Sequence, residues 1–109
     1  MRIQIGLAMA AMTAMALATA ASAQPQLSDP AYVEAARCAG LASSKTLASP
    51  DAAAMKALVS NQSTGRDPLV LNQADEASRN ARAEADRAGP EAKAHLQAEL
   101  SGRCAGLKG

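Results

Sequence analysis

The sequence is poor in the large apolar side chains that build most protein cores. It contains no tryptophan and no phenylalanine, and Tyr32 is its only aromatic residue. Past residue 23, only 12 of the remaining 86 residues are Leu, Val, Ile or Phe. That share lies below the roughly one-fifth that separates globular from disordered compositions. We therefore expect a thin core that needs further stabilisation to offset the entropy of ordering the chain.

The motifs of several reaction classes are also missing. His95 is the only histidine, and the sequence has neither a G-x-S-x-G segment nor a glycine-rich phosphate loop. The two cysteines lack the C-x-x-C spacing of redox catalysts and the C-x-x-C-H of haem attachment. Nothing in so alanine-rich a chain indicates the desolvated pocket that would raise the pKa of a catalytic carboxyl group. We expect a protein that is not an enzyme and carries no cofactor.

Net charge is missing as well once the first 23 residues are set aside. The remaining 86 residues carry ten Lys plus Arg and ten Asp plus Glu. Clustered basic charge supplies most of the affinity for nucleic acid, so no nucleic-acid partner is expected. The balance also gives no electrostatic reason to bind an anionic lipid surface.

The amino terminus has the order of a secretory signal peptide. Met1 and Arg2 precede an apolar stretch over residues 3–18, and Ala21-Ser22-Ala23 fits the A-x-A cleavage pattern. We expect a signal peptide over residues 1–23 with cleavage after Ala23, although Ala18-Thr19-Ala20 fits too. The apolar stretch is shorter than the roughly 20 residues of a spanning helix, and no cysteine lies nearby to accept a lipid. A soluble periplasmic or secreted protein is the expectation, with no membrane contact after cleavage.

The pentapeptide Arg-Cys-Ala-Gly-Leu occurs twice, over residues 37–41 and 103–107, and contains both cysteines. An exported chain reaches an oxidising compartment, so we expect a Cys38–Cys104 disulfide. Closing so wide a loop stabilises a fold by about 4 kcal/mol in the chain-entropy model. We expect Ala-Gly in each copy to allow close backbone approach beside the bridge. Two free thiols and intermolecular pairing are the alternatives.

Proline and capping residues mark successive helix starts. Ser28-Asp29-Pro30, Ser49-Pro50-Asp51 and Asp67-Pro68 each combine a capping side chain with a proline tolerated in the first turn. After an extended lead over residues 24–29, we expect a single domain over residues 30–109 with four helices, at about 30–44, 52–60, 67–88 and 91–107. With 20 alanines past residue 23 and no alternating β-branched run, the fold class is all-α.

Two of these helices have a defined apolar face. The last one carries Leu96, Leu100, Cys104 and Leu107 at helical spacing. The third carries a stripe of small residues that we call the alanine stripe, formed by Val70, Ala74, Ala77, Ala81, Ala85 and Ala88. We expect the stripe to pack inside the domain; burial against a partner is the alternative. Two ion pairs are expected along the other side of this helix, Asp75 with Arg79 and Glu84 with Arg87.

One cluster could hold a metal. Glu91, His95 and Glu99 recur at spacings of four and so share a helix face. Ligands in line along one helix do not converge on one ion as in a dedicated site, and no second histidine is available. We expect a solvated charged face and no metal.

These features favour a small exported helical protein with a non-catalytic binding or interaction role. A role in the stress response is one version of this hypothesis. In outline, an exported helical chain with one wide disulfide is similar to the acid-activated periplasmic chaperones, although none of their sequence patterns can be placed on residues here. A ligand or metal carrier using Glu91, His95 and Glu99, and a largely disordered exported peptide, are the alternatives. The sequence identifies neither a protein partner nor an oligomeric state.

Overall fold

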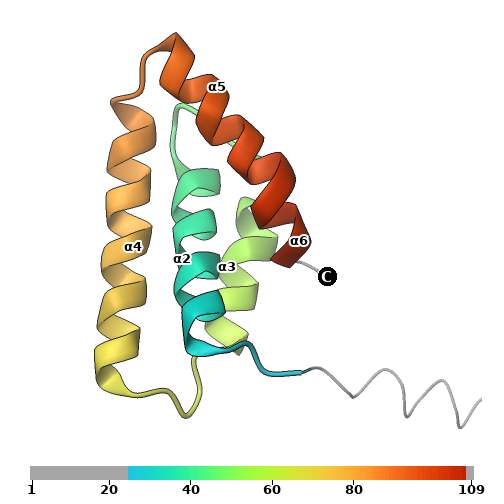
Figure 1. Ribbon diagram of the computed structural model, residues 1–109, viewed down its shortest axis with the longest axis vertical. Helices are drawn as coiled ribbons and strands as arrows, with labels where there is room; N and C mark the ends of the chain where they lie inside the picture. The colour runs from blue at the N-terminus through green and yellow to red at the C-terminus, as the bar shows by residue number, and fades with distance from the viewer. Residues whose placement is uncertain (1–24, 108–109) are drawn as a thin grey trace, which may run out of the picture.

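A computed structural model describes residues 25–107 (Figure 1). They form helices and no strand, in the order α2 (Asp29–Ser43), α3 (Ala52–Asn61), α4 (Pro68–Asp86), α5 (Pro90–Glu99), the π-helical turn η1 (Leu100–Cys104) and α6 (Ala105–Leu107). The predicted all-α bundle with one disulfide is confirmed. The predicted signal peptide, residues 1–23, lies outside the described residues. Within residues 25–107 no helix is long and apolar enough to cross a membrane.

The helix starts follow the capping signals in the sequence. Ser28 accepts a hydrogen bond at Oγ from the amide of Ala31 (3.3 Å), and Asp67 accepts one from the amide of Leu69 (2.8 Å). Proline stands in the first turn of α2, α4 and α5. The start of α3 differs, because Ser49 accepts from the amide of Asp51 in the preceding turn and the helix itself has no side-chain cap.

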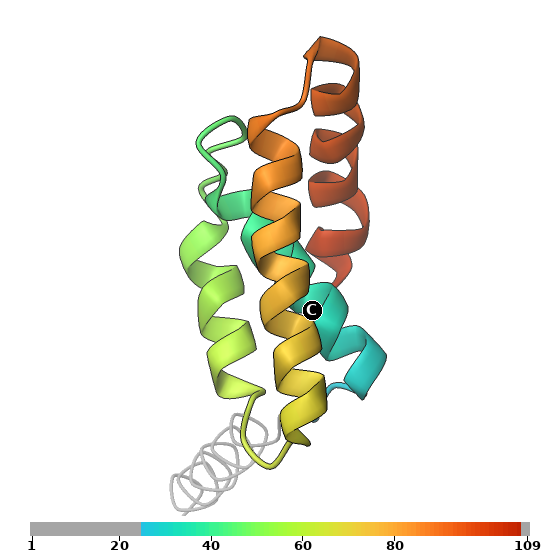
Figure 2. The ribbon, with the colours of Figure 1, turned by 90° about the vertical axis from the view of Figure 1, so that its left-hand side faces the viewer.

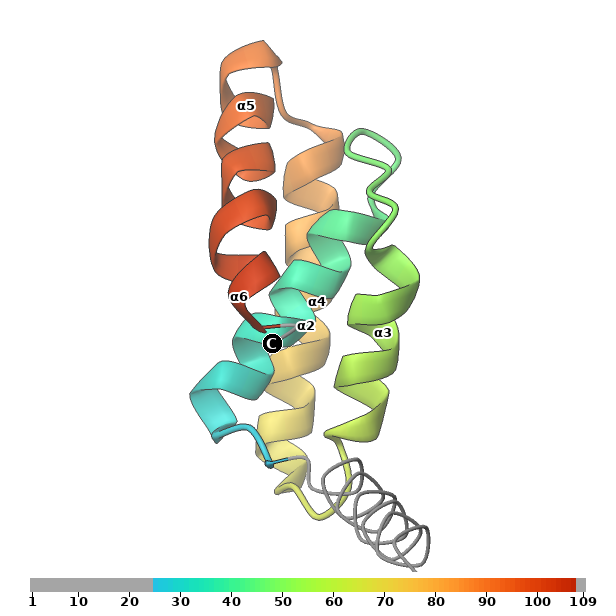
Figure 3. The same ribbon diagram turned by 90° about the vertical axis from the view of Figure 1, so that its right-hand side faces the viewer.

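Helix α2 lies at the centre of the bundle and packs against α4, α3 and η1. Figure 2 shows α4 in front of α2, and Figure 3 shows α5 and α3 on opposite sides of α2. Helices α2 and α4 run in the same direction, while α3 runs the opposite way (Figure 1). Helices α3 and α4 therefore reach the core through α2, while α5 packs against η1 and α4.

Small residues let α2 and α4 approach closely. A Cβ added at Gly40 would lie 2.9 Å from the Cα of Ser78 and closer still to its carbonyl oxygen. The alanine stripe faces this contact: Ala74, Ala81 and Ala85 are buried, and the stripe's other residues are partly buried. The stripe thus packs inside the domain, as expected.

The ion pairs of α4 are only partly as predicted. Arg79 binds Asp75 at 3.1 Å, one turn away on the same helix. Glu84 does not pair with Arg87; it accepts a hydrogen bond from Arg37 of α2 instead (3.1 Å). The predicted pair was wrong because a partner on the adjacent helix lies within reach of Glu84. Helix α4 also ends at Asp86, earlier than predicted, where the Asp86 carboxylate accepts from the amide of Lys45 in the α2–α3 loop (3.1 Å).

A nearly buried arginine closes the end of the bundle at which α2 begins. The Arg66 guanidinium donates to the carbonyl of Leu27 (2.7 Å), the carbonyl of Gln62 (2.6 Å) and the carboxylate of Asp29 (2.7 Å). It also lies 4.3 Å from the ring centroid of Tyr32, within cation–π distance. These contacts hold the extended lead against the α3–α4 loop and fix the only aromatic side chain.

Candidate functional site

The predicted disulfide is present and joins the first helix to the last turn of the fold. Cys38 lies in α2 and Cys104 in η1, with their Cα atoms 5.6 Å apart. Both cysteines are buried, in a cluster with Ala39 and Met55. Free thiols in the described residues are therefore absent, and the bridge is shielded from reductants in solution.

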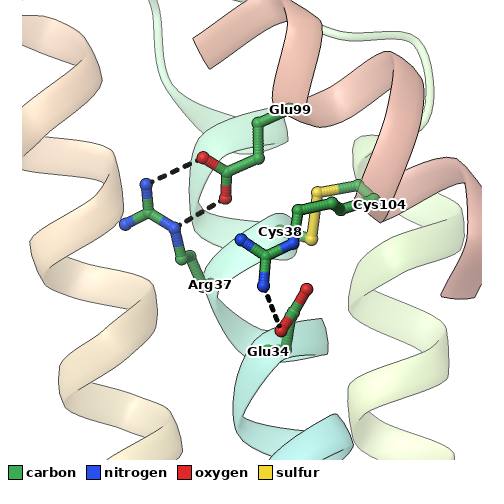
Figure 4. Close-up of a disulfide and its surroundings, with 6 residues drawn as sticks. Glu34, Arg37, Cys38, Glu99 and Cys104 are labelled. Atoms are coloured by element: carbon green, nitrogen blue, oxygen red, sulfur yellow. Dashed lines mark hydrogen bonds and ion pairs between the residues drawn. A yellow bond between two sulfur atoms is a disulfide. The ribbon is translucent and has the colours of Figure 1, made fainter. Parts of the chain in front are cut away.

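Two ion pairs flank the disulfide in a reciprocal arrangement (Figure 4). Arg37, which precedes Cys38, donates from Nε to Glu99 of α5 (2.7 Å) and from a terminal nitrogen to the other Glu99 oxygen (3.0 Å). Arg103, which precedes Cys104, donates to Glu34 of α2 (2.9 Å). Each arginine of the repeated pentapeptide thus binds a glutamate on the other cysteine's side. We call the disulfide with these two pairs the clasp.

The π-helical turn η1 places Glu99 relative to Cys104 much as Glu34 is placed relative to Cys38. Cys38 follows Glu34 by four positions, one α-helical turn, whereas Cys104 follows Glu99 by five positions. A π-turn closes over five residues instead of four, so η1 places Glu99 one turn before Cys104 despite the extra residue. The prediction of one continuous helix over 91–107 is therefore corrected, because a π-turn interrupts it. This turn accommodates the extra residue and lets Arg37 and Arg103 reach their glutamate partners.

The Arg37–Glu99 ion pair shifts the pKa of both of its side chains. The hydrogen bonds from Arg37 lower the pKa of Glu99, while burial acts in the opposite direction. The same hydrogen bonds raise the pKa of Arg37 above its usual value. Glu84 on α4 also accepts from Arg37, so one guanidinium holds α2, α4 and α5 together.

The two pentapeptides do not form the matched close contacts that the repeat predicts. Gly40 does allow close approach, but to Ser78 of α4 and not beside the bridge. Gly106 has open space around it, and both Ala105 and Gly106 are exposed. The prediction was wrong for the second copy because α6 lies at the edge of the bundle with no helix packed against that face.

The candidate metal ligands are not brought together. Glu99 is bound by Arg37, while Glu91 and His95 are exposed along α5. Residues 25–107 contain no group of three or more His, Cys, Asp or Glu side chains that could hold a metal ion. The metal-carrier alternative therefore gains no support from the described residues.

A groove between α3 and α4, floored by α2, is a more suitable binding site. Its volume is about 360 Å³, near the lower end for ligand sites, and it is lined by Tyr32, Ala36, Ala39, Lys56, Val59, Ser60, Leu71, Ala74, Asp75, Ser78 and Arg82. The floor is apolar, because the α2 residues are two alanines and the tyrosine. We call this site the α3–α4 groove.

Sequence reasoning missed the groove, although one signal for it is present. Leu71, Ala74, Ser78 and Arg82 follow one another at spacings of three, four and four, so they share a face of α4 that includes Ala74 of the alanine stripe. Leu71 is 36% exposed although it is large and apolar. The position of α3 across from this face could not be deduced from the sequence, since it depends on the loops at both ends of α3.

A second hollow, of about 390 Å³, lies between the α2–α3 loop and the last helical segments. Its lining combines the polar Ser49, Asp51, Gln97 and Ser101 with the apolar Leu47, Pro50, Leu100 and Ala105. Its exposed lining is more polar than that of the α3–α4 groove.

No family model, curated protein or solved structure matches the chain. Function is therefore inferred from the chemistry of the described residues alone.

Proposed function

We propose that this chain is a small exported binding protein without catalytic activity, and that the α3–α4 groove holds an apolar group of its ligand. The supporting observation is an apolar-floored hollow beside a large apolar side chain that stays partly exposed, Leu71. Exposed apolar surface in a groove is typical of ligand or partner sites. Export is consistent with the disulfide, because such bonds persist in oxidising compartments.

The groove is better suited to binding than to catalysis. Its lining includes no histidine and no cysteine, and its one acid, Asp75, is already bound by Arg79. Neither the Ser60 nor the Ser78 hydroxyl hydrogen-bonds, within the described residues, to a side chain that would activate it as a nucleophile. What remains is shape, apolar surface and fixed charge, which are the requirements of a binding site.

The clasp and Arg66 hold in place the helices that line the groove. Helices α3 and α4 both pack on α2, and α2 is held by the disulfide and by Arg37 on its other sides. At the end where α2 begins, Arg66 fixes the Tyr32 ring that forms part of the floor. These contacts keep the α3–α4 groove open although the chain has few large side chains.

The test is the binding of a neutral apolar dye, Nile red, followed by fluorescence. Two matched variants on α4 separate the groove from other apolar surface: Leu71→Ala changes a lining residue, whereas Leu69→Ala changes a leucine that is 65% exposed and outside the lining. Covering the remaining exposed third of Leu71 contributes about 0.5 to 1 kcal/mol, so Leu71→Ala should weaken binding about two- to six-fold. Leu69→Ala should leave the affinity unchanged.

Two results would contradict the proposal. Absence of saturable dye binding by the folded, oxidised protein would remove the groove as a site. Equal weakening by the two leucine variants would show that the dye binds exposed side chains at the start of α4 instead.

A further inference from the structure

The α3–α4 groove is lined by two cationic side chains. Lys56 of α3 and Arg82 of α4 both line it, and neither forms an ion pair with another residue in the part of the chain that the structure describes. Asp75 is the one acidic lining residue, and its carboxylate lies 3.1 Å from the guanidinium of Arg79. The groove therefore presents two uncompensated positive charges.

The helix directions place Arg82 at one end of the groove and Lys56 near its middle, with their side chains leaning towards each other. Lys56 lies in the first half of α3 and Arg82 near the end of α4, and α3 begins at the end of the bundle at which α4 finishes (Figure 2). Side chains on a helix lean towards its amino terminus, so Arg82 leans back along α4 while Lys56 leans the opposite way. The two cationic groups thus converge from opposite walls.

The other end of the groove is apolar. Tyr32 lies near the start of α2, Leu71 near the start of α4 and Val59 towards the end of α3, at the end opposite Arg82, while Lys56 lies midway along α3, less than one helical turn from Val59. At about 1.5 Å of rise per helical residue, Leu71 and Arg82 lie about 16 Å apart along α4. A slender ligand with an apolar tail and one anionic head matches this division.

The size of the groove favours a single chain over a helix. With its side chains a helix is about 10–12 Å across, so a helix of this length would occupy more than about 1,000 Å³. The groove encloses about 360 Å³. An extended alkyl chain fits within that volume, whereas only one edge of a helix could enter it.

We propose that the α3–α4 groove binds a single-chain amphiphile with a carboxylate head group, a proposal that rests on the binding role given above. The alkyl chain lies over Tyr32, Val59 and Leu71, and the carboxylate lies between Lys56 and Arg82. A carboxylate suits this position because it accepts hydrogen bonds from the fork of an arginine and from an ammonium group at once.

The experiment is displacement of Nile red from the oxidised protein by decanoate and by decan-1-ol, which share a chain length and differ in head-group charge. The test variant combines Lys56→Gln and Arg82→Gln. The control combines Lys45→Gln and Arg87→Gln, two exposed residues outside the groove, and changes net charge equally. Circular dichroism establishes that both variants keep the helical fold.

In the wild type and the control variant, decanoate should displace the dye at about two- to thirty-fold lower concentration than the alcohol, as expected for two solvent-exposed charge contacts. The advantage should disappear in the test variant, and it should shrink in 1 M salt, where screening acts within about 3 Å. The alcohol should act equally on all three proteins.

The outcomes separate the two proposals. If Nile red itself does not bind, the binding role fails. If the dye binds but decanoate and decan-1-ol displace it equally, or if the control variant loses the preference as well, the carboxylate assignment is overturned while the binding role stands. Displacement by anionic phospholipid vesicles but not by monomeric decanoate, or by an acidic helical peptide alone, would likewise overturn it.

Discussion

Both copies of the repeated pentapeptide have a glycine at the fourth position, and the structure predicts opposite effects on stability when each glycine is replaced by alanine. Gly40 lies where α2 meets α4, with no room for a Cβ beside Ser78, whereas Gly106 has open space around it. In a helix, alanine is favoured over glycine by about 1 kcal/mol when nothing else changes. At Gly40 this gain is opposed by the collision with backbone atoms, which no side-chain rotation can relieve.

The magnitude follows from the two opposing terms. Overpacking a well-packed contact costs about 1 to 3 kcal/mol, and the upper part of that range applies because the obstacle is main chain. Subtracting the helix preference leaves a net loss of about 2 kcal/mol for Gly40→Ala. At about 0.05 to 0.15 kcal/mol per residue, a domain of this size has only about 4 to 12 kcal/mol of stability to lose. Gly106→Ala should be neutral or slightly stabilising.

Thermal unfolding of the two oxidised variants, followed by circular dichroism, measures the difference. The melting temperature of Gly40→Ala should fall by about 8 to 16 °C, while that of Gly106→Ala should stay or rise. Equal melting temperatures for the two variants, or a rise for Gly40→Ala, would refute the close approach of α2 and α4 on which the packing of the alanine stripe depends.

Two further predictions concern the clasp. Replacing both cysteines by serine should remove about 4 kcal/mol, since the bridge closes a loop with a sequence separation of 66; a urea-unfolding midpoint identical to that of the oxidised wild type would contradict the staple. Because Arg37 lowers the pKa of Glu99 in the folded state, the stabilisation from this carboxylate is present above its unfolded pKa near 4.5 and is lost as the pH falls through the lower folded value. Between pH 7 and pH 3 the urea midpoint should therefore fall less in Glu99→Gln than in wild type, whereas the exposed Glu91→Gln serves as the control; the same pH dependence in all three proteins would rule out the pair.

The fold class could be predicted because local signals agree along the chain. Ser28 and Asp67 cap the helices that follow them, and the alanine stripe packs inside the domain as its spacing indicates. Cys38 and Cys104 could be paired from the expected compartment and from their number alone. The helix inferences depend on residues that are close in sequence. The disulfide inference depends on there being only two cysteines to pair.

The rest depends on contacts between helices that spacing does not encode. Glu84 pairs with Arg37 on the adjacent helix instead of along α4, and the regular spacing of Leu96, Leu100 and Cys104 did not indicate the π-turn that contains Cys104. Helical spacing placed Glu99 beside His95, but Arg37 binds it on the inner side of α5. The α3–α4 groove was missed because Lys56 and Arg82 belong to different helices and line one groove only in the folded chain.

The most direct test of the account is a two-dimensional NMR titration of the oxidised protein with decanoate. We predict saturable changes in amide shifts that centre on the α3–α4 groove, around Lys56, Val59, Leu71 and Arg82, with none around the second hollow at Ser49 and Gln97. Shifts confined to that second hollow, or no saturable change at any residue, would contradict the account.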